Sequence, residues 1–256
     1  VLAMSPDDLR EFRRNKLSMV FQKFALLPHR TVAQNAAYGL TIQGIVEAEA
    51  TERAQRWIDR VGLGGFENHY PAQLSGGMQQ RVGLARALAT DAPILLMDEA
   101  FSALDPLIRT DMQDILLDLQ QELHKTIVFI THDLDEALRI GDQISILRDG
   151  EVIQQGDPQD IIMRPADDYI SDFIKDINRG RVIEVRSVMA NAGRVSGPKM
   201  PANTALEDAL QARAAAGRES GAVVDEDGQT IGKIEMNAAI TAMARPDRGK
   251  GTPRYK

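Results

Sequence analysis

The chain has 256 residues, which is enough for one full domain and a smaller second one. Its formal net charge of −7 argues against nucleic acid as the main partner, and the lack of cysteine excludes disulfides and thiolate metal sites. The composition, 43% hydrophobic and 26% charged, is that of a globular protein. No apolar run approaches the ~20 residues that a helix needs to cross a bilayer, so we expect no membrane-spanning helix in this sequence.

The first part of the chain predicts one short strand among several helices. Residues 7–14 indicate a short charged helix, and residues 17–21 indicate a strand that leads to Gln22. A helical pattern then runs from residue 31 to residue 61 and stops at the glycine-rich segment 62–65. One apolar face of this pattern is formed by Ala50, Ala54, Trp57, Ile58 and Val61.

Two apolar runs predict buried strands of a parallel sheet. The first run, Ile94–Met97, follows a predicted helix over residues 79–89, whose buried side is formed by Val82, Ala85 and Leu88. The second run, Thr126–Thr131, ends at His132. Strands that alternate with helices indicate an α/β fold, and a hairpin signal at Arg148–Gly150 adds an antiparallel pair to give a mixed sheet.

Composition changes after residue 180 and suggests four segments. Residues 1–180 are expected to form the α/β domain, with a helical subdomain at about 31–88. Residues 181–204 are rich in Gly, Pro, Ser, Asn and Ala and predict a linker. Residues 205–244 predict a small α+β unit, and residues 245–256 form a polar, basic tail.

Two places in the sequence offer chemistry for a phosphate and a metal. Ser75 and the pair Gly76–Gly77 stand where a helix starts, so backbone N–H groups there can close on an anion. Asp98 and Glu99 follow a buried strand, and adjacent residues of an extended chain point opposite ways. One carboxylate can therefore serve a metal and the other a water, whereas the simpler alternative is a solvated acidic turn.

In their order along the chain, these motifs resemble those of ABC-transporter ATPases. Leu74–Arg81 resembles the signature loop, Ile94–Glu99 the Walker B strand, and Ser102–Asp105 the D-loop. The resemblance covers roughly residues 9–156 and continues more weakly to residue 178. It implies the ABC ATPase core, a mixed sheet with a helical subdomain, and ATP and Mg²⁺ as cofactors.

The resemblance also implies roles for four residues around a phosphate and its metal. Gln22 matches the Q-loop glutamine, which touches the metal and the attacking water. Asp98 matches the Walker B aspartate that holds Mg²⁺ through water, and Glu99 matches the general base that polarises the hydrolytic water. His132 matches the switch histidine, a second catalytic group that contacts the γ-phosphate, although a lone histidine is more often structural.

Five further residues are expected to act across a homodimer of the ATPase. In the family, the residues that match Ser75, Gly76, Gly77 and Met78 close on the γ-phosphate of ATP held by the opposite subunit. Met78 stands where many family members have glutamine. Asp105 matches the D-loop aspartate at that interface, and simple capping of the next helix is its structural alternative.

One family motif is missing from the sequence. A nucleotide motor needs a G-x-x-x-x-G-K-[ST] loop to cradle the β- and γ-phosphates, and none occurs in the 256 residues. The expectation is therefore that the sequence is the C-terminal part of a longer protein, with an ABC core incomplete at its N-terminus, and that it does not hydrolyse ATP alone.

The amino-acid sequences of three segments narrow the resemblance to one subfamily. Phe21–His29, Met97–Arg109 and His132–Ala137 closely resemble the ATPase subunit of bacterial importers for glycine betaine, proline and other quaternary amines. That subfamily implies a partner permease, an indirect periplasmic substrate-binding protein and a place on the cytoplasmic face of the bacterial inner membrane. Open alternatives are an importer for amino acids or polyamines and a non-catalytic regulatory remnant.

The predicted C-terminal unit also has a family likeness. Residues 205–243 resemble a single CBS repeat, most clearly in Ala222–Gly228 and Gly232–Ile234. The alternative for this unit is a plain α+β dimerisation appendage.

Overall fold

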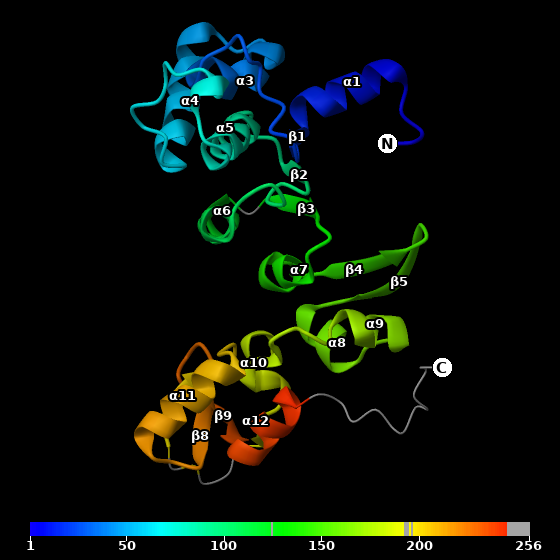
Figure 1. Ribbon diagram of the computed structural model, residues 1–256, viewed down its shortest axis with the longest axis vertical. Helices are drawn as coiled ribbons and strands as arrows, with labels where there is room; N and C mark the ends of the chain where they lie inside the picture. The colour runs from blue at the N-terminus through cyan, green and yellow to red at the C-terminus, as the bar shows by residue number, and fades with distance from the viewer. Residues whose placement is uncertain (124, 192–194, 196, 245–256) are drawn as a thin grey trace, which may run out of the picture. The chain divides into compact units, whose positions relative to one another are not determined.

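The computed structural model describes residues 1–123, 125–191, 195 and 197–244 (Figure 1). The chain divides into two compact units, Val1–Asp133 and Leu134–Lys256, and each is described by itself. The division falls well before the boundary expected near residue 180. The physical reason is a single apolar core of the second unit, which includes Leu134, Ile183 and Ala239 and so spans the expected boundary.

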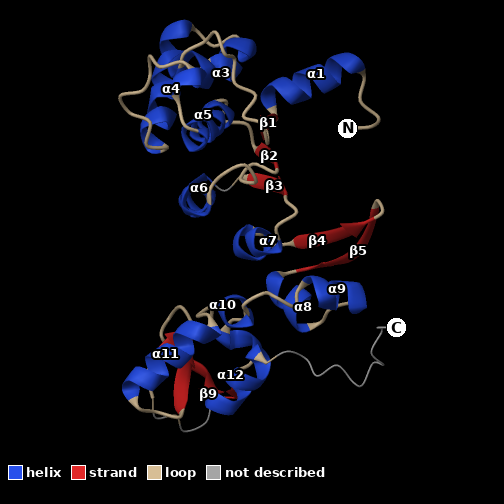
Figure 2. Cartoon of the chain, in the orientation of Figure 1, coloured by secondary structure: helices blue, strands red, loops and turns tan. Residues whose placement is uncertain are grey.

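The first unit consists of a three-stranded sheet and a group of helices (Figure 2). Its helices are α1 (Pro6–Asn15), α2 (Val32–Ala36), α3 (Tyr38–Gln43), α4 (Glu47–Arg60), α5 (Gly76–Ala89) and α6 (Pro106–Leu123), with a 3-10 turn at Pro71–Gln73. Its strands are β1 (Leu17–Val20), β2 (Ile94–Asp98) and β3 (Thr126–Ile130).

The three strands are parallel and run in the order β1-β2-β3. Val20 pairs with Met97, and Asp98 pairs with Ile130, so the three strands end at the same edge of the sheet. The central strand β2 buries Leu95 and Met97, as the apolar run predicted. The register therefore gathers whatever follows the three strands into one place.

The strand β3 is less buried than the sequence predicted. Val128 and Ile130 are 48% and 58% exposed, so one face of the strand is open in the described residues. The cause is that none of the described residues covers the face of β3 on which Val128 and Ile130 lie, because burial of an apolar run depends on neighbours that its own sequence does not contain.

Four helices of the first unit, α2, α3, α4 and α5, contact one another and form the helical part expected between the first two strands (Figure 1). The apolar positions fall where the periodicity placed them. On α4 the buried residues are Ala50, Ala54 and Ile58, and on α5 they include Val82, Ala85 and Leu88. The helix α2 starts at Thr31, whose side chain forms a reciprocal capping box with Gln34.

A buried amide fixes the loop between β1 and α2. Asn35 is fully buried, and its side chain accepts a hydrogen bond from the N–H of Leu27 at 2.8 Å. Its amide nitrogen donates to the carbonyl oxygens of Leu27, Arg30 and Thr31 at 3.0–3.1 Å. One side chain thus satisfies four backbone groups of a segment that has no regular structure.

The second unit begins with α7 and contains two sheets. Its helices are α7 (Leu134–Ile140), α8 (Pro158–Met163), α9 (Asp168–Phe173), α10 (Arg179–Val182), α11 (Leu206–Ala216) and α12 (Met236–Met243), with a 3-10 turn at Val185–Ser187. Its strands are β4 (Ile144–Arg148), β5 (Glu151–Gly156), β6 (Ala190–Asn191), β7 (Lys199–Pro201), β8 (Ser220–Val224) and β9 (Thr230–Glu235). The predicted hairpin β4–β5 is antiparallel, but it forms a two-stranded sheet of its own and does not join β1-β2-β3, so the mixed sheet expected from these five strands is not formed among the described residues. The other sheet of this unit has the order β6-β9-β8-β7.

The expected linker at 181–204 contains structure instead. It includes the end of α10, the 3-10 turn and the strands β6 and β7, which complete the sheet of the C-terminal unit. Its Gly, Pro and Ser content suggested a loop, but Ile183, Val185 and Met200 are buried in the core of the second unit. The small α+β unit expected at residues 205–244 contains α11, β8, β9 and α12, and the basic tail lies outside the described residues.

Among the described residues, no helix is both long enough and apolar enough to cross a membrane.

We predict that Asn35→Ala lowers the free energy of unfolding by about 2–4 kcal/mol, because it removes a fully buried side chain together with the hydrogen-bond partner of the Leu27 N–H and of the Arg30 carbonyl. Urea denaturation followed by the fluorescence of Trp57, the single tryptophan, measures the change. The control is Gln121→Ala on the exposed side of α6, which should change stability by less than about 0.5 kcal/mol. A loss below about 1 kcal/mol for Asn35→Ala would contradict this role.

Candidate active site and signature loop

Three residues predicted from the sequence meet at the ends of the parallel strands. The amide nitrogen of Gln22 donates a hydrogen bond to Oε2 of Glu99 at 2.6 Å. Nδ1 of His132 lies 3.3 Å from the same oxygen. Glu99 is about one-third exposed and His132 about two-thirds, so the group opens to solvent. With Oε2 occupied by these two neighbours, Oε1 of Glu99 remains for a further ligand such as a water.

The backbone of Glu99 is held in an unusual conformation. Its φ is +43°, in the left-handed region, which disfavours a non-glycine residue by roughly 1–2 kcal/mol. Its N–H donates to the carbonyl of Ile130 at 2.8 Å, which ties it to the end of β3. Its carbonyl accepts bonds from both the N–H and the hydroxyl of Ser102, at 3.1 and 2.9 Å. The surrounding turn therefore fixes the backbone from which the carboxylate projects.

Asp98 and Gln22 offer the oxygen ligands that a hard cation prefers. Asp98 is half-buried at the end of β2, next to Glu99. Because the Gln22 nitrogen faces Glu99, its amide oxygen is left without a hydrogen bond among the described residues. One carboxylate and one amide oxygen suit Mg²⁺, which takes few protein ligands and completes its shell with water and phosphate. No cluster of three or more His, Cys, Asp or Glu side chains suited to a metal occurs in the described part of the chain.

The glycine pair lies at the start of a 14-residue helix, as the motif predicted. The hydroxyl of Ser75 accepts the N–H of Met78 at 3.3 Å and caps α5. A Cβ added to Gly77 would lie 2.6 Å from a methyl group of Ile108, so only glycine lets α6 approach so closely. A Cβ on Gly76 would meet only the Phe24 ring, at 3.7 Å. The exposed N-terminus of α5 carries the positive end of the helix dipole.

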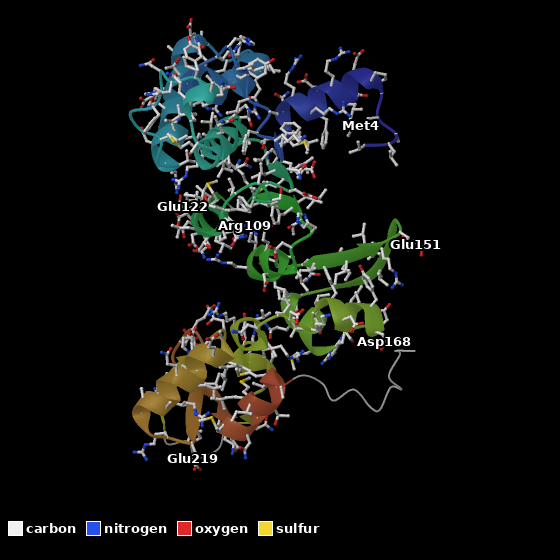
Figure 3. The ribbon with its side chains drawn as sticks, in the orientation of Figure 1. Met4, Arg109, Glu122, Glu151, Asp168 and Glu219 are labelled. Atoms are coloured by element: carbon white, nitrogen blue, oxygen red, sulfur yellow. The ribbon has the colours of Figure 1, made fainter. Side chains whose placement is uncertain are left out.

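Asp105 performs the structural role that its sequence context suggested. Its carboxylate accepts the N–H of Ile108 at 3.1 Å and caps α6, and the residue is exposed. Arg109 on the same helix (Figure 3) donates to the Asp133 carboxylate at 3.1 Å and to the Leu104 carbonyl at 3.3 Å. These bonds fasten the segment after His132 to the segment that carries Asp105.

The predicted site residues thus form two groups. Gln22, Glu99 and His132 are in direct contact, with Asp98 adjacent in sequence. The segment Ser75–Met78 forms a separate group at the start of α5. Among the described residues, no hydrogen bond or ion pair joins it to Glu99.

Comparison with known proteins identifies the family. The family model described as "ABC transporter" matches residues 3–102. The chain is 58% identical over 198 residues to the glycine betaine transport ATP-binding protein OpuAA of Bacillus subtilis, covering 77% of this chain and 47% of the relative. It is 43% identical over 242 residues to the trimethylamine N-oxide transport system ATP-binding protein TmoW of Pelagibacter ubique, covering 94% and 71%. The chain belongs to the ABC transporter family of ATP-binding proteins.

A solved ABC structure supports the fold. A dimeric post-hydrolysis state of the ATP-binding cassette MJ0796, bound to ADP and Pi, is 38% identical with a TM-score of 0.55, covering 61% of this chain and 68% of that one. The α/β ABC ATPase fold expected from the motifs is therefore confirmed. The chain spans 47–66% of the lengths of three glycine betaine transport relatives.

Three residues with clear roles in the site were not singled out from the sequence of this ABC chain. Ser102 holds the carbonyl of Glu99, Ile108 packs on Gly77, and Arg86 donates to two carbonyls of the loop after Gln22. For Arg86 there was a signal, because it is the one charged residue in the otherwise apolar run 82–89. For Ser102 the signal was a hydroxyl three residues after the acid, which is the spacing of a turn.

We predict that alanine at the two glycines changes the free energy of unfolding in different directions. Gly77→Ala should lower the free energy of unfolding by about 1–3 kcal/mol, because the new methyl group collides with Ile108. Gly76→Ala should leave stability unchanged or raise it by up to about 1 kcal/mol, since alanine favours helix and the site has room. Urea denaturation measures both, and adding Ile108→Ala to Gly77→Ala should recover part of the loss. Equal effects of the two alanines would refute the close approach of α6.

Proposed function

We propose that the chain is part of the ATP-hydrolysing subunit of an importer for an osmolyte such as glycine betaine, proline or another quaternary amine. The observation that carries the proposal is the convergence of Gln22 and His132 on one oxygen of Glu99, at the edge where parallel sheets bind ligands. The relatives named for glycine betaine and trimethylamine N-oxide transport support the class of substrate.

In this proposal Glu99 is the general base for hydrolysis of ATP. Water attacks the γ-phosphorus, the bond to the β-phosphate oxygen breaks, and the proton of the water passes to the free oxygen of Glu99. Gln22 and His132 hold the other oxygen, so the carboxylate keeps one direction while the water changes position. Mg²⁺, when bound, supplies charge neutralisation at the phosphates. Asp98 and the amide oxygen of Gln22 are the groups of this chain that would hold it.

We place the start of α5 against the γ-phosphate of a nucleotide held by a second copy of the ATPase. Gly76 and Gly77 offer backbone N–H groups, and the turn Ser75–Met78 carries the positive end of the helix dipole, which suits an anion. The dimeric form of MJ0796 with ADP and Pi supports a homodimer. Asp105 lies exposed at the end of its turn, where it can meet that second copy.

The remaining partners follow from the transport role. We propose a membrane-embedded permease that receives the segment after Gln22, in which Pro28 is exposed and Phe24, Leu26 and Leu27 are half-buried. The ATPase then works at the cytoplasmic face of the bacterial inner membrane, and the periplasmic substrate-binding protein acts through the permease. The segment 205–244 would serve as a CBS-like regulatory unit on the same chain.

We predict that Glu99→Gln retains ATP binding and slows hydrolysis by about 10²–10⁴-fold, because the amide keeps its shape but accepts no proton. The measurement is single-turnover hydrolysis by a fusion in which an ATPase segment that contains a G-x-x-x-x-G-K-[ST] loop precedes Val1. Size-exclusion chromatography with Mg-ATP should show that this variant accumulates as an ATP-bound dimer. The unfused chain serves as the blank, and Glu52→Gln on the exposed side of α4 serves as the matched control.

The neighbouring acid should behave differently. Asp98→Asn should raise the Mg²⁺ concentration needed for half-maximal hydrolysis, whereas Glu99→Gln should leave that concentration unchanged. Near-normal turnover in the Glu99 variant would remove it from the role of base and make His132 the next candidate.

A further inference from the structure

The loop after Gln22 has a strained backbone conformation that contacts from outside the loop must stabilise. Phe24 and Ala25 are consecutive non-glycine residues in the left-handed region, with φ of +57° and +47°. Non-glycine residues are uncommon in this region, and this strained pair persists where surrounding contacts determine it. The loop also begins at the residue that contacts Glu99, so its shape decides where the Gln22 amide lies.

Arg86, on the helix α5 that starts at the glycine pair, stabilises this conformation with two hydrogen bonds. Its Nη1 donates to the carbonyl of Ala25 at 2.6 Å, and its Nη2 donates to the carbonyl of Phe24 at 3.1 Å. The two bonds use the guanidinium as a rigid fork on two successive carbonyls. Burial lowers the pKa of Arg86, and no described carboxylate forms an ion pair with it. The hydrogen bonds of its guanidinium therefore go to the backbone of the loop.

The same face of α5 touches the loop at two further positions. A Cβ atom added to Gly76 would lie 3.7 Å from the ring of Phe24. A Cβ atom added to Gly83 would lie 3.7 Å from the carbonyl oxygen of Phe24. Gly76, Gly83 and Arg86 are separated by seven and three residues, so they share one side of the helix. The loop therefore lies along α5 from its anion-binding start to its third turn.

We infer that Arg86 is a positioning residue that makes the Gln22–Glu99 contact depend on the placement of the signature helix α5. The inference deepens the proposed function and rests on it. Two sensors of the γ-phosphate, the Gln22 amide and the start of α5, are joined by one loop whose shape Arg86 fixes. Because the forked bonds join Phe24 and Ala25 to α5, a change in the position of α5 would move this pair and, with it, Gln22 relative to Glu99.

The test is Arg86→Lys, which keeps the charge and the stem but replaces the fork with a single ammonium. In the fusion that carries the G-x-x-x-x-G-K-[ST] loop, we expect kcat to fall about tenfold or more while KM for ATP changes less than threefold. The control is Arg56→Lys on the exposed side of α4, which should leave both constants unchanged.

A second readout separates positioning from general stability. In a Gln22→Ala background, Arg86→Lys should lower kcat by no more than twofold, because the side chain that Arg86 positions is already gone. Hydrogen exchange of the unfused chain should show faster exchange over residues 21–30 in Arg86→Lys, with unchanged exchange over residues 106–123. The test uses Arg86→Lys and does not use Arg86→Ala, whose loss of the whole side chain could prevent the protein from folding.

Three outcomes would overturn the inference. These are an unchanged kcat in Arg86→Lys, a loss of equal size with and without Gln22→Ala, and faster exchange spread over the whole first unit. If Glu99→Gln also hydrolyses ATP normally, the proposed function fails as well. If Glu99→Gln is blocked while Arg86→Lys behaves as the parent, only the role of Arg86 is refuted.

Discussion

The in-register parallel pairing of β1, β2 and β3 determines the rest of the site. Because Val20, Met97 and Phe129 lie side by side, the residues that follow each strand emerge at one edge. Gln22, Glu99 and His132 are 33 or more residues apart in sequence, and only this register brings their polar atoms to a common oxygen. A shift by one residue in any strand would point its functional side chain to the other face.

Backbone strain accumulates next to this edge and has identifiable supports. Glu99 is held by Ile130 and Ser102, and the pair Phe24–Ala25 is held by Arg86. Both segments occupy the left-handed region although neither contains glycine. The supports come from β3, from the turn after β2 and from α5, so the geometry of the acid and of the loop reflects three different elements. Such an arrangement suits a site that must respond to movement of a helix.

Periodicity and motif order predicted much of the fold of the first unit. The α/β ABC fold was expected and is confirmed, and the buried faces of α4 and α5 fall where the spacing of Ala50, Ala54 and Ile58 or of Val82 and Ala85 placed them. Predictions failed where burial depends on distant neighbours. Ile130 belongs to an apolar run yet is exposed, because none of the described residues covers its face of β3.

The sequence predicted the functional residues of the site but not the residues that hold them in place. The motifs named Gln22, Glu99 and His132, and their chemical roles stay predictions until they are measured. Composition suggested a linker around Val185 and Met200, although the packing of a few apolar residues outweighs a Gly- and Ser-rich background. The role of Arg86 is set by carbonyls about 60 residues away in sequence, which local patterns do not contain.

The most direct test of the central claim is a crystal structure of the fusion with Mg²⁺, ADP and vanadate, which imitates the transferring phosphoryl group. The account predicts that the free oxygen of Glu99 lies within hydrogen-bond distance of the apical oxygen on vanadium, with Gln22 and His132 beside it. A Glu99 side chain turned away from vanadium, with another residue at the apical oxygen, would contradict the account.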